Sequence, residues 1–165
     1  MTNQDEERDD EQGAVITEDS LLIGALLRIP FSVVGEATQH GLEAAGFGEV
    51  RVAHLPVLQP LAARPEGARM TDLAAWAHIT KPSMVYLVNH LEAHGYVERS
   101  ADPLDGRAQR VRITARGLAA IHQARRLVRQ TEADWADRIG GEQLEQLKRS
   151  LRALSASLRA SDGAR

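Results

Sequence analysis

Residues 99–117 restrict the fold of this chain more than any other stretch, because they have the pattern of a basic β-hairpin. Turn-forming Asp-Pro and Asp-Gly pairs at 102–106 separate two short runs with strand character, 96–97 and 111–113. Five arginines in the stretch oppose only two acids. The pattern predicts a hairpin with Arg107 at a long tip, and a positive hairpin suits the narrow, electronegative minor groove of DNA. A solvated surface hairpin is the alternative.

Two short helices joined by a turn are predicted before the hairpin. The first covers roughly 71–78, and Thr71 is expected to cap its N-terminus. Residues 79–81 form the turn, and a second helix over 82–94 starts with a proline, which is favoured in the first turn of a helix. Gly95 is expected to end this helix in the left-handed conformation.

The two faces of the second helix differ in chemistry. Its apolar residues recur at i, i+3, i+4 and i+7, which places them on one buried stripe. They are Met84, Leu87, Val88 and Leu91. The opposite face is short, polar and almost uncharged, as expected of a helix that contacts base edges in a major groove. It carries Pro82, Tyr86 and Asn89, flanked by Ser83, Val85 and His90.

Residues 70–117 resemble the winged helix-turn-helix of the MarR family of bacterial transcriptional regulators. The segment ITKPSMVYLVNHLEAHGYVER ends as many winged helices do. The segment DPLDGRAQRVRITARG has the wing pattern of the family, Asp-Pro-x-Asp-Gly-Arg followed by Val-x-Ile-Thr-x-x-Gly. The helical flanks extend the resemblance over about 20–160. Tyr86 is a departure, because small polar residues or arginine are commoner at this position in the family.

The resemblance implies a mainly α fold with a small β-hairpin wing, a winged helix-turn-helix with dimerisation helices at both ends. Its implied parts are an acidic tail, 1–18, and a single domain, 19–165, with a DNA-binding lobe, 51–116, between dimerisation helices, 19–46 and 117–161. In the family, the wing-tip arginine enters the minor groove and a nearby aspartate helps to orient it. These roles correspond to Arg107 and Asp105.

Two further kinds of DNA contact are expected from this arrangement. Basic side chains beside the recognition helix would bind phosphates, and they are Lys81, Arg99 and Arg110. Side chains on or beside its exposed face would lie against bases or backbone, and they are Ser83, Val85, Tyr86, Asn89 and His90. Two such helices in a homodimer would occupy successive major grooves of double-stranded DNA, about 34 Å apart, on a pseudo-palindromic site.

Helices are also expected in the flanking regions. A first segment, 21–34, begins after a capping residue at 19 or 20, and Pro30 must kink it or begin a second helix. The others cover 52–61, 115–138 and 142–161, and Thr114 is expected to cap the helix over 115–138. In the last segment, leucines spaced by 3, 4, 3 and 4 residues predict a coiled-coil-like seam. They are Leu144, Leu147, Leu151, Leu154 and Leu158.

A single chain cannot easily cover both this seam and the apolar stripe of 21–34. We therefore expect the two ends of the chain to meet in a homodimer, with packing inside one chain as the alternative. The predicted dimer residues are Leu22, Leu26, Leu147, Leu151 and Leu154.

The charge of the chain is unevenly distributed. The net charge is −3, but residues 1–20 hold eight acids and one arginine, so residues 21–165 carry +4. The tail is almost free of apolar residues over 1–14 and is predicted to be disordered. A positive remainder is compatible with binding to nucleic acid.

Composition excludes several classes of protein. The length of 165 residues suits one domain, and 43% of the residues are hydrophobic. The chain has no cysteine, which excludes disulfides, thiolate metal sites and thiol-based redox sensing. No apolar run approaches the roughly 20 residues of a membrane span. The N-terminus is acidic rather than basic and apolar, so no signal peptide is expected and a cytoplasmic protein is the default.

Neither an enzyme nor a cofactor is implied. The chain has no phosphate-binding glycine loop, no His-Glu-x-x-His and no Gly-x-Ser-x-Gly. His90 and His94 are four residues apart, but zinc needs three or four converging ligands. No metal site is predicted, and a metal-responsive regulator of the same fold stays an alternative. A winged helix that binds only protein is the other alternative, and the basic charge of this wing argues against it.

By resemblance, such regulators are often repressors that small, frequently aromatic or anionic effectors release from DNA. The effector pocket of the family lies between the dimerisation helices and the DNA-binding lobe. Candidates at that location are Phe31, His40, His54, Leu58 and Trp76. Of these, Phe31, Leu58 and Trp76 are favoured as core residues rather than ligand contacts.

Overall fold

The computed structural model describes residues 22–102 and 105–162, and for residues 106, 107 and 159–162 it describes the backbone alone. Contacts within the chain define two units, Met1–Val33 and Val34–Arg165, whose boundary falls inside helix α1, Ile23–Ala44. The predicted disorder of 1–18 and the predicted cap at 19 or 20 lie outside the described residues. No helix in the described ranges is long and apolar enough to cross a membrane.

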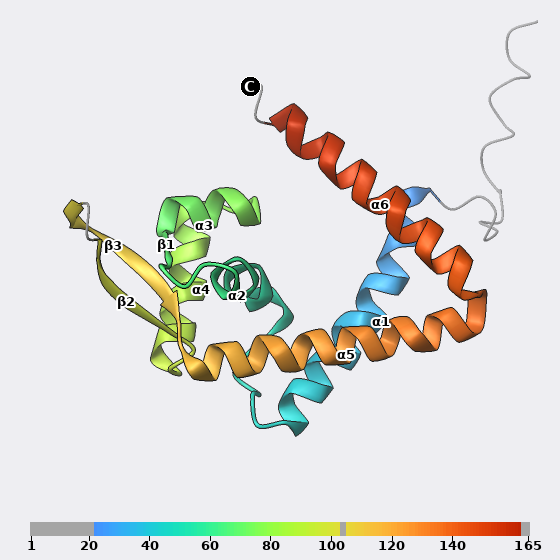
Figure 1. The fold of residues 1–165 in the computed structure, drawn as a ribbon, viewed down its shortest axis with the longest axis horizontal. Helices are drawn as coiled ribbons and strands as arrows, with labels where there is room; N and C mark the ends of the chain where they lie inside the picture. The colour runs from blue at the N-terminus through green and yellow to red at the C-terminus, as the bar shows by residue number, and fades with distance from the viewer. Residues whose placement is uncertain (1–21, 103–104, 163–165) are drawn as a thin grey trace, which may run out of the picture. The chain divides into compact units, whose positions relative to one another are not determined.

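The elements after α1 are short helices and a small sheet, followed by the long helices α5 and α6 (Figure 1). In chain order they are η2, Val52–His54; α2, Leu55–Ala62; β1, Ala68–Arg69; α3, Met70–Ala77; α4, Lys81–Ala93; β2, Val97–Asp102; β3, Asp105–Ile113; α5, Ala115–Ile139; and α6, Gly141–Asp162. The fold is therefore mainly α with an antiparallel wing, as the sequence predicted. Helix α1 continues through Pro30, so a second helix does not begin there.

The wing is a three-stranded antiparallel sheet in the order β1-β3-β2. Its hairpin pairs Val97 with Ile113 and extends to a pair between Asp102 and Asp105. The strands are thus longer than predicted, and Arg107 lies within β3 rather than in a long tip. Strand β1 was not predicted, because two residues are too few to show an alternating pattern.

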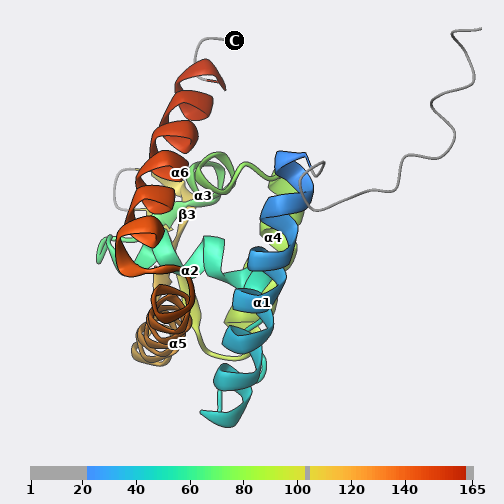
Figure 2. The same ribbon diagram turned by 90° about the vertical axis from the view of Figure 1, so that its right-hand side faces the viewer.

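The core lies among helices α2, α3 and α4, the sheet and the first turns of α5 (Figure 1; Figure 2). Val57, Leu58 and Leu61 of α2 are fully buried, and the predicted apolar stripe of α4 is buried except for half-buried Leu87. Fully buried side chains include Leu42, Val57, Leu58, Leu61, Leu73, Met84, Val88, Leu91, Tyr96 and Ile121. This single cluster fixes α4 against the base of the wing.

Local signals set the ends of the two central helices. Thr80 caps α4, because its hydroxyl accepts a hydrogen bond from the backbone N–H of Ser83 at 3.3 Å. Gly95 follows α4 with φ +74°, as predicted from its glycine. The Thr71 prediction is wrong: α3 begins at Met70, directly after β1, and its N-cap Arg69 makes no side-chain capping bond.

The junction between the wing and α5 is tightly packed. The Thr114 hydroxyl accepts a hydrogen bond from the Gly117 N–H at 3.1 Å, which confirms the predicted cap. The same hydroxyl donates to the Gly95 carbonyl oxygen at 2.7 Å. A Cβ at position 117 would clash with the Tyr96 carbonyl oxygen, so only glycine allows the helix to approach the strand this closely.

Candidate nucleic-acid interface

Helix α4 presents one exposed face along its first turns. Its Thr80 cap and buried stripe fix the rotation of the helix, and this leaves Lys81, Ser83 and Tyr86 exposed. Tyr86 is 73% exposed, which is high for a large aromatic side chain in a folded chain. Asn89 is exposed one turn further on, and Val85 is half-buried at the edge of the face. The structure thus brings four of the five predicted base-side residues to one face or its edge.

Arg99 does not project freely from the wing. Its Nη1 donates to a Glu92 carboxylate oxygen, and its Nη2 donates to Asn89 Oδ1 at 2.5 Å. The side chain is only 21% exposed. In the single chain the arginine thus bridges β2 and α4, and its predicted phosphate contact stays a prediction.

Arg110 is also placed otherwise than predicted. Its Nε lies 3.2 Å from Asp102 Oδ2, and its Nη1 donates to the Gly67 carbonyl oxygen at 3.3 Å. Asp102 is buried, and Arg69 Nε donates to the same carboxylate oxygen at 2.7 Å. This hydrogen bond and the charge of Asp102 raise the pKa of Arg69. A buried carboxylate needs such compensation, which Arg110 and Arg69 supply, and the predicted phosphate contact of Arg110 stays a prediction.

The wing turn carries the remaining predicted contact. Asp105 is exposed, and its Oδ2 lies 4.0 Å from Arg69 Nη2. Arg69 thus stands between the buried Asp102 and the exposed Asp105, a role that its sequence neighbourhood did not suggest. The expected partner of Asp105 is Arg107, whose backbone lies in β3 and whose side chain lies outside the described set.

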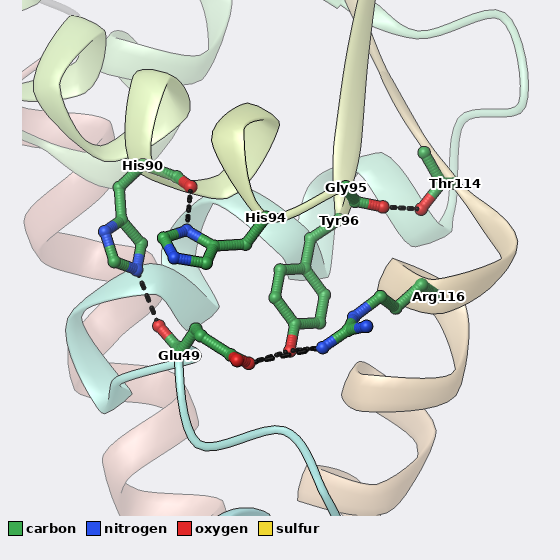
Figure 3. A network of polar contacts seen from close by, with 7 residues as sticks. All are labelled: Glu49, His90, His94, Gly95, Tyr96, Thr114 and Arg116. Carbon is green, nitrogen blue, oxygen red and sulfur yellow. Dashed lines mark hydrogen bonds and ion pairs between the residues drawn. The ribbon is translucent and has the colours of Figure 1, made fainter.

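His90 turns away from the exposed face of α4 (Figure 3). Its Nε2 donates to the Glu49 carbonyl oxygen at 2.7 Å, and its ring stacks on His54 with centroids 4.5 Å apart. The His94 ring also contacts the His90 ring, again with centroids 4.5 Å apart, and its Nδ1 donates to the His90 carbonyl oxygen. In the single chain the half-buried His90 ring is thus engaged with Glu49, His54 and His94, and its predicted contact with DNA stays a prediction.

A second set of contacts joins the same region to α5 (Figure 3). The Glu49 carboxylate accepts from the Tyr96 hydroxyl at 2.7 Å and lies 3.3 Å from Arg116 Nη2. The Tyr96 hydrogen bond is the main reason that the pKa of Glu49 is lowered, and burial raises the pKa of Tyr96. The guanidinium of Arg116 also lies over the Tyr96 ring, 4.7 Å from its centroid. The C-terminal end of α4 is thereby fastened to the start of α5.

His54 is the buried member of the histidine stack. Its Nδ1 accepts a hydrogen bond from the Arg51 backbone N–H at 2.9 Å. Burial, together with the charges of His90 and Arg51, lowers the pKa of His54 to about 4, so the ring is neutral at pH 7. Within the described ranges, no group of three histidine or acidic side chains is arranged to hold a metal ion.

The predicted effector residues have different surroundings. Leu58 is fully buried in the core, as favoured, and His54 is buried in its stack. Phe31 is 69% exposed and Trp76 is 42% exposed, so their assignment to the core is wrong in the single chain. The Arg64 guanidinium covers Trp76 at 4.0 Å from the ring centroid. His40 is exposed on α1.

An open, mainly apolar cavity of about 490 Å³ lies instead between the α2 side of the lobe and the first turns of α4. None of the predicted effector residues lines it. Its lining residues are Ala53, Pro56, Ile79, Pro82, Ser83, Tyr86 and Leu87. Sequence reasoning missed it because small and aliphatic residues from three segments carry no chemical signal of a ligand site.

The predicted dimer residues lie on both terminal helices. Leu22, just before α1, and Leu26 on α1 are exposed, and Leu147 and Leu154 are exposed on α6. Leu151 is half-buried, whereas Leu144 at the start of the same seam is buried. Exposed leucines at this spacing are compatible with a second copy of the chain, and the homodimer stays a prediction.

Comparison with known proteins agrees with this geometry. A model of the MarR family matches residues 50–108. The transcriptional repressor CouR bound to a 23-mer DNA duplex is 26% identical, with a TM-score of 0.72 over 86% of this chain and 97% of that one. CouR from Rhodococcus jostii RHA1 bound to p-coumaroyl-CoA is 26% identical, with a TM-score of 0.64 over 80% of this chain and 90% of that one. A MarR family protein of Mycobacterium tuberculosis in complex with salicylic acid is 28% identical, with a TM-score of 0.62 over 84% and 99% of the two chains.

Proposed function

Because this chain belongs to the MarR family of DNA-binding transcriptional regulators, we propose that it acts as a homodimeric repressor on a pseudo-palindromic operator. The observation that carries the proposal is the exposed face of α4, where Tyr86 and Asn89 stand beside a basic wing. Regulators of this family are not enzymes. Action on a bacterial operator would take place in the cytoplasm.

Each element of the lobe has a proposed role on DNA. The first turns of α4 enter the major groove, with Ser83, Tyr86 and Asn89 toward base edges and Lys81 toward a phosphate. The wing approaches the flanking minor groove with Arg107, as its resemblance to the family implies. Asp105 helps to orient that arginine. The two arginines first expected on phosphates, Arg99 and Arg110, are left out of this set because both are engaged inside the lobe.

Selection from a random pool of double-stranded DNA tests the proposal. The wild-type protein is expected to enrich an inverted repeat whose half-sites are about one helical turn apart. Arg107→Ala should lower affinity for the selected duplex in fluorescence anisotropy without lowering thermal stability. Arg129→Ala, which removes the same charge from an exposed site on α5, is the control. A pool with no enriched sequence would contradict sequence-specific binding.

The dimer is proposed from the exposed leucines of α6. Leu154 is exposed in the single chain, so a charge there should leave the folded protomer intact but could not be desolvated in an interface. Leu154→Glu is expected to shift sedimentation equilibrium toward monomer, whereas Ala156→Glu on another side of α6 should not. A Leu154→Glu protein that stays dimeric would show that the interface does not include Leu154.

Effector release is proposed from the cavity beside Tyr86. A small aromatic molecule seated there would lie against the recognition helix, and the size and apolar lining of the cavity suit such a ligand. Two similar structures hold salicylic acid and p-coumaroyl-CoA. Salicylic acid should therefore release the protein from its selected duplex, and Ala53→Trp, which fills the cavity, should abolish that release. Release that survives Ala53→Trp would place the effector elsewhere.

A further inference from the structure

Arg99 links the wing to the recognition helix through two side chains one helical turn apart. Its strand position is fixed by pairing with Val111 of β3. One arm of its guanidinium donates to Glu92 and the other to Asn89 Oδ1 at 2.5 Å. Since Asn89 and Glu92 are three residues apart on α4, they share a face of the helix. The mostly covered guanidinium therefore bridges a rigid strand and a surface that meets DNA.

The chemistry of this contact determines how the Asn89 amide is turned. A guanidinium has only hydrogen-bond donors, so the amide must direct its oxygen toward Arg99. The opposite corner of the amide then carries Nδ2 and its two hydrogens. Asn89 itself is exposed, so its NH₂ group is accessible to a ligand. A free asparagine could present either end of its amide, but this one is held in a single orientation.

We propose that Arg99 is a positioning residue for base recognition, which holds Asn89 so that it donates from Nδ2 to acceptor atoms in the major groove. The acceptors that this predicts are N7 and O6 of guanine, O4 of thymine, or N7 of adenine through a single hydrogen bond. The bidentate contact of asparagine with adenine needs the amide oxygen to face the base as well, and that oxygen is turned to Arg99. The inference rests on the proposed operator binding and specifies one contact within it.

Glu92 explains why the guanidinium stays on the helix when DNA is present. Its carboxylate compensates the charge of Arg99, and the charge-assisted hydrogen bond fixes one arm of the fork. An arginine without this partner would be drawn to a phosphate. Glu92→Gln keeps a hydrogen-bond acceptor for Arg99 and removes one negative charge near DNA. This variant should bind more tightly overall and keep the base preference of the wild type.

Selection from random duplex DNA, followed by anisotropy, tests the inference. Arg99→Met should relax the preference at one base pair in each half-site and lower the ratio of selected to random affinity by about tenfold. Arg112→Met removes a similar charge from the neighbouring strand and is the matched control, which should keep the preference. Asn89→Asp keeps an oxygen for Arg99 but has no donor, so its preference at that base pair should move to cytosine, whose N4 donates.

A double variant separates positioning from direct contact. If Arg99 acts through Asn89, then Arg99→Met combined with Asn89→Ala should lose no more selectivity than Asn89→Ala alone. Equal weakening of selected and random DNA by Arg99→Met, with a salt dependence reduced by about one contact, would make Arg99 a phosphate ligand and overturn the inference. An unchanged base preference of Asn89→Asp would overturn it as well. A wild-type protein that selects no sequence would overturn operator binding itself.

Discussion

The two ends of helix α4 have different surroundings, although one regular helix contains both. At the N-terminal end, Lys81, Ser83 and Tyr86 are exposed, and Ser83 hydrogen-bonds to Thr80, the N-cap residue of the helix. At the C-terminal end, His90 and Asn89 are engaged with η2, the preceding loop and β2. We expect the first end to be a surface for DNA and the second to be an anchor for the helix. Substitutions at the first end should change binding, and those of His90 and of the buried residues at the second end should change folding. Exposed Asn89 belongs to both, because it is held by Arg99 and is also proposed to contact a base.

The largest effect is expected from Leu91→Ala at the anchored end. Leu91 is fully buried in the core, so its truncation should lower the free energy of unfolding by about 2–5 kcal/mol. Urea denaturation measures this loss. A loss below about 1 kcal/mol would mean that the core relaxes around the site, and the anchored end would then be softer than its burial indicates.

Acid should weaken the anchored end next. The pKa of His54 is lowered to about 4 from 6.5, so the folded state favours the neutral ring. The contribution of the neutral ring to the free energy of unfolding is complete above pH 6.5. It is lost as the pH falls toward 4, and the whole loss is roughly 3 kcal/mol. Protonation of His54 is opposed by His90, His94 and Arg51, all of which face it.

Urea midpoints measured from pH 7 to pH 5 test this loss, because few carboxylates titrate in that range. His54→Gln should flatten the profile, whereas His122→Gln, at an exposed site on α5, should leave it unchanged. A profile that is identical in the wild type and in His54→Gln would show that the stack does not resist protonation.

Tyr86→Ala tests the exposed end. Its ring is mostly in solvent, so stability should change by less than about 0.5 kcal/mol, as for other surface sites. The ratio of selected to random DNA affinity should fall by about 1–3 kcal/mol if the ring contacts a base. Fluorescence anisotropy with the selected and the random duplex measures both affinities. Equal losses on both would assign Tyr86 to the DNA backbone.

The smallest effect is expected from Tyr96→Phe, which removes one hydroxyl from the anchor. That hydroxyl donates to Glu49 and accepts from Arg116 Nη2 at 3.1 Å. The loss should cost about 0.5–1.5 kcal/mol of stability, and DNA affinity should stay the same. Thermal unfolding and anisotropy together provide the check. Weaker DNA binding at unchanged stability would show that this network also sets the orientation of α4.

The sequence predicted the helices and the wing because their signals are local. Apolar spacing, the proline at 82 and the glycine at 95 act within a few residues, and they placed α4 to within one residue at each end. Strand β1 and the start of α3 could not be predicted in this way, because they depend on pairing with β3. Position 71 looked like a cap only while the preceding strand was unknown.

The candidate site was harder to predict, because a charged side chain has several partners within reach and sequence does not rank them. Arg99 and Arg110 were expected on phosphates, and in the single chain they pair with Glu92 and buried Asp102. His90 was expected near bases, and long-range stacking on His54 turned it inward. Exposure of Phe31 and Trp76 also escaped prediction, since aromatic residues are more often buried.

The pairing of Arg64 with Trp76 has an optical consequence. The chain has only two tryptophans, at 76 and 135. Trp76 is on α3, and its ring lies under the guanidinium of Arg64. Indole emission responds to a nearby cation and to solvent. A Trp135→Phe protein would therefore carry a single intrinsic fluorophore on its DNA-binding lobe, and docking on a duplex could be followed without any attached dye.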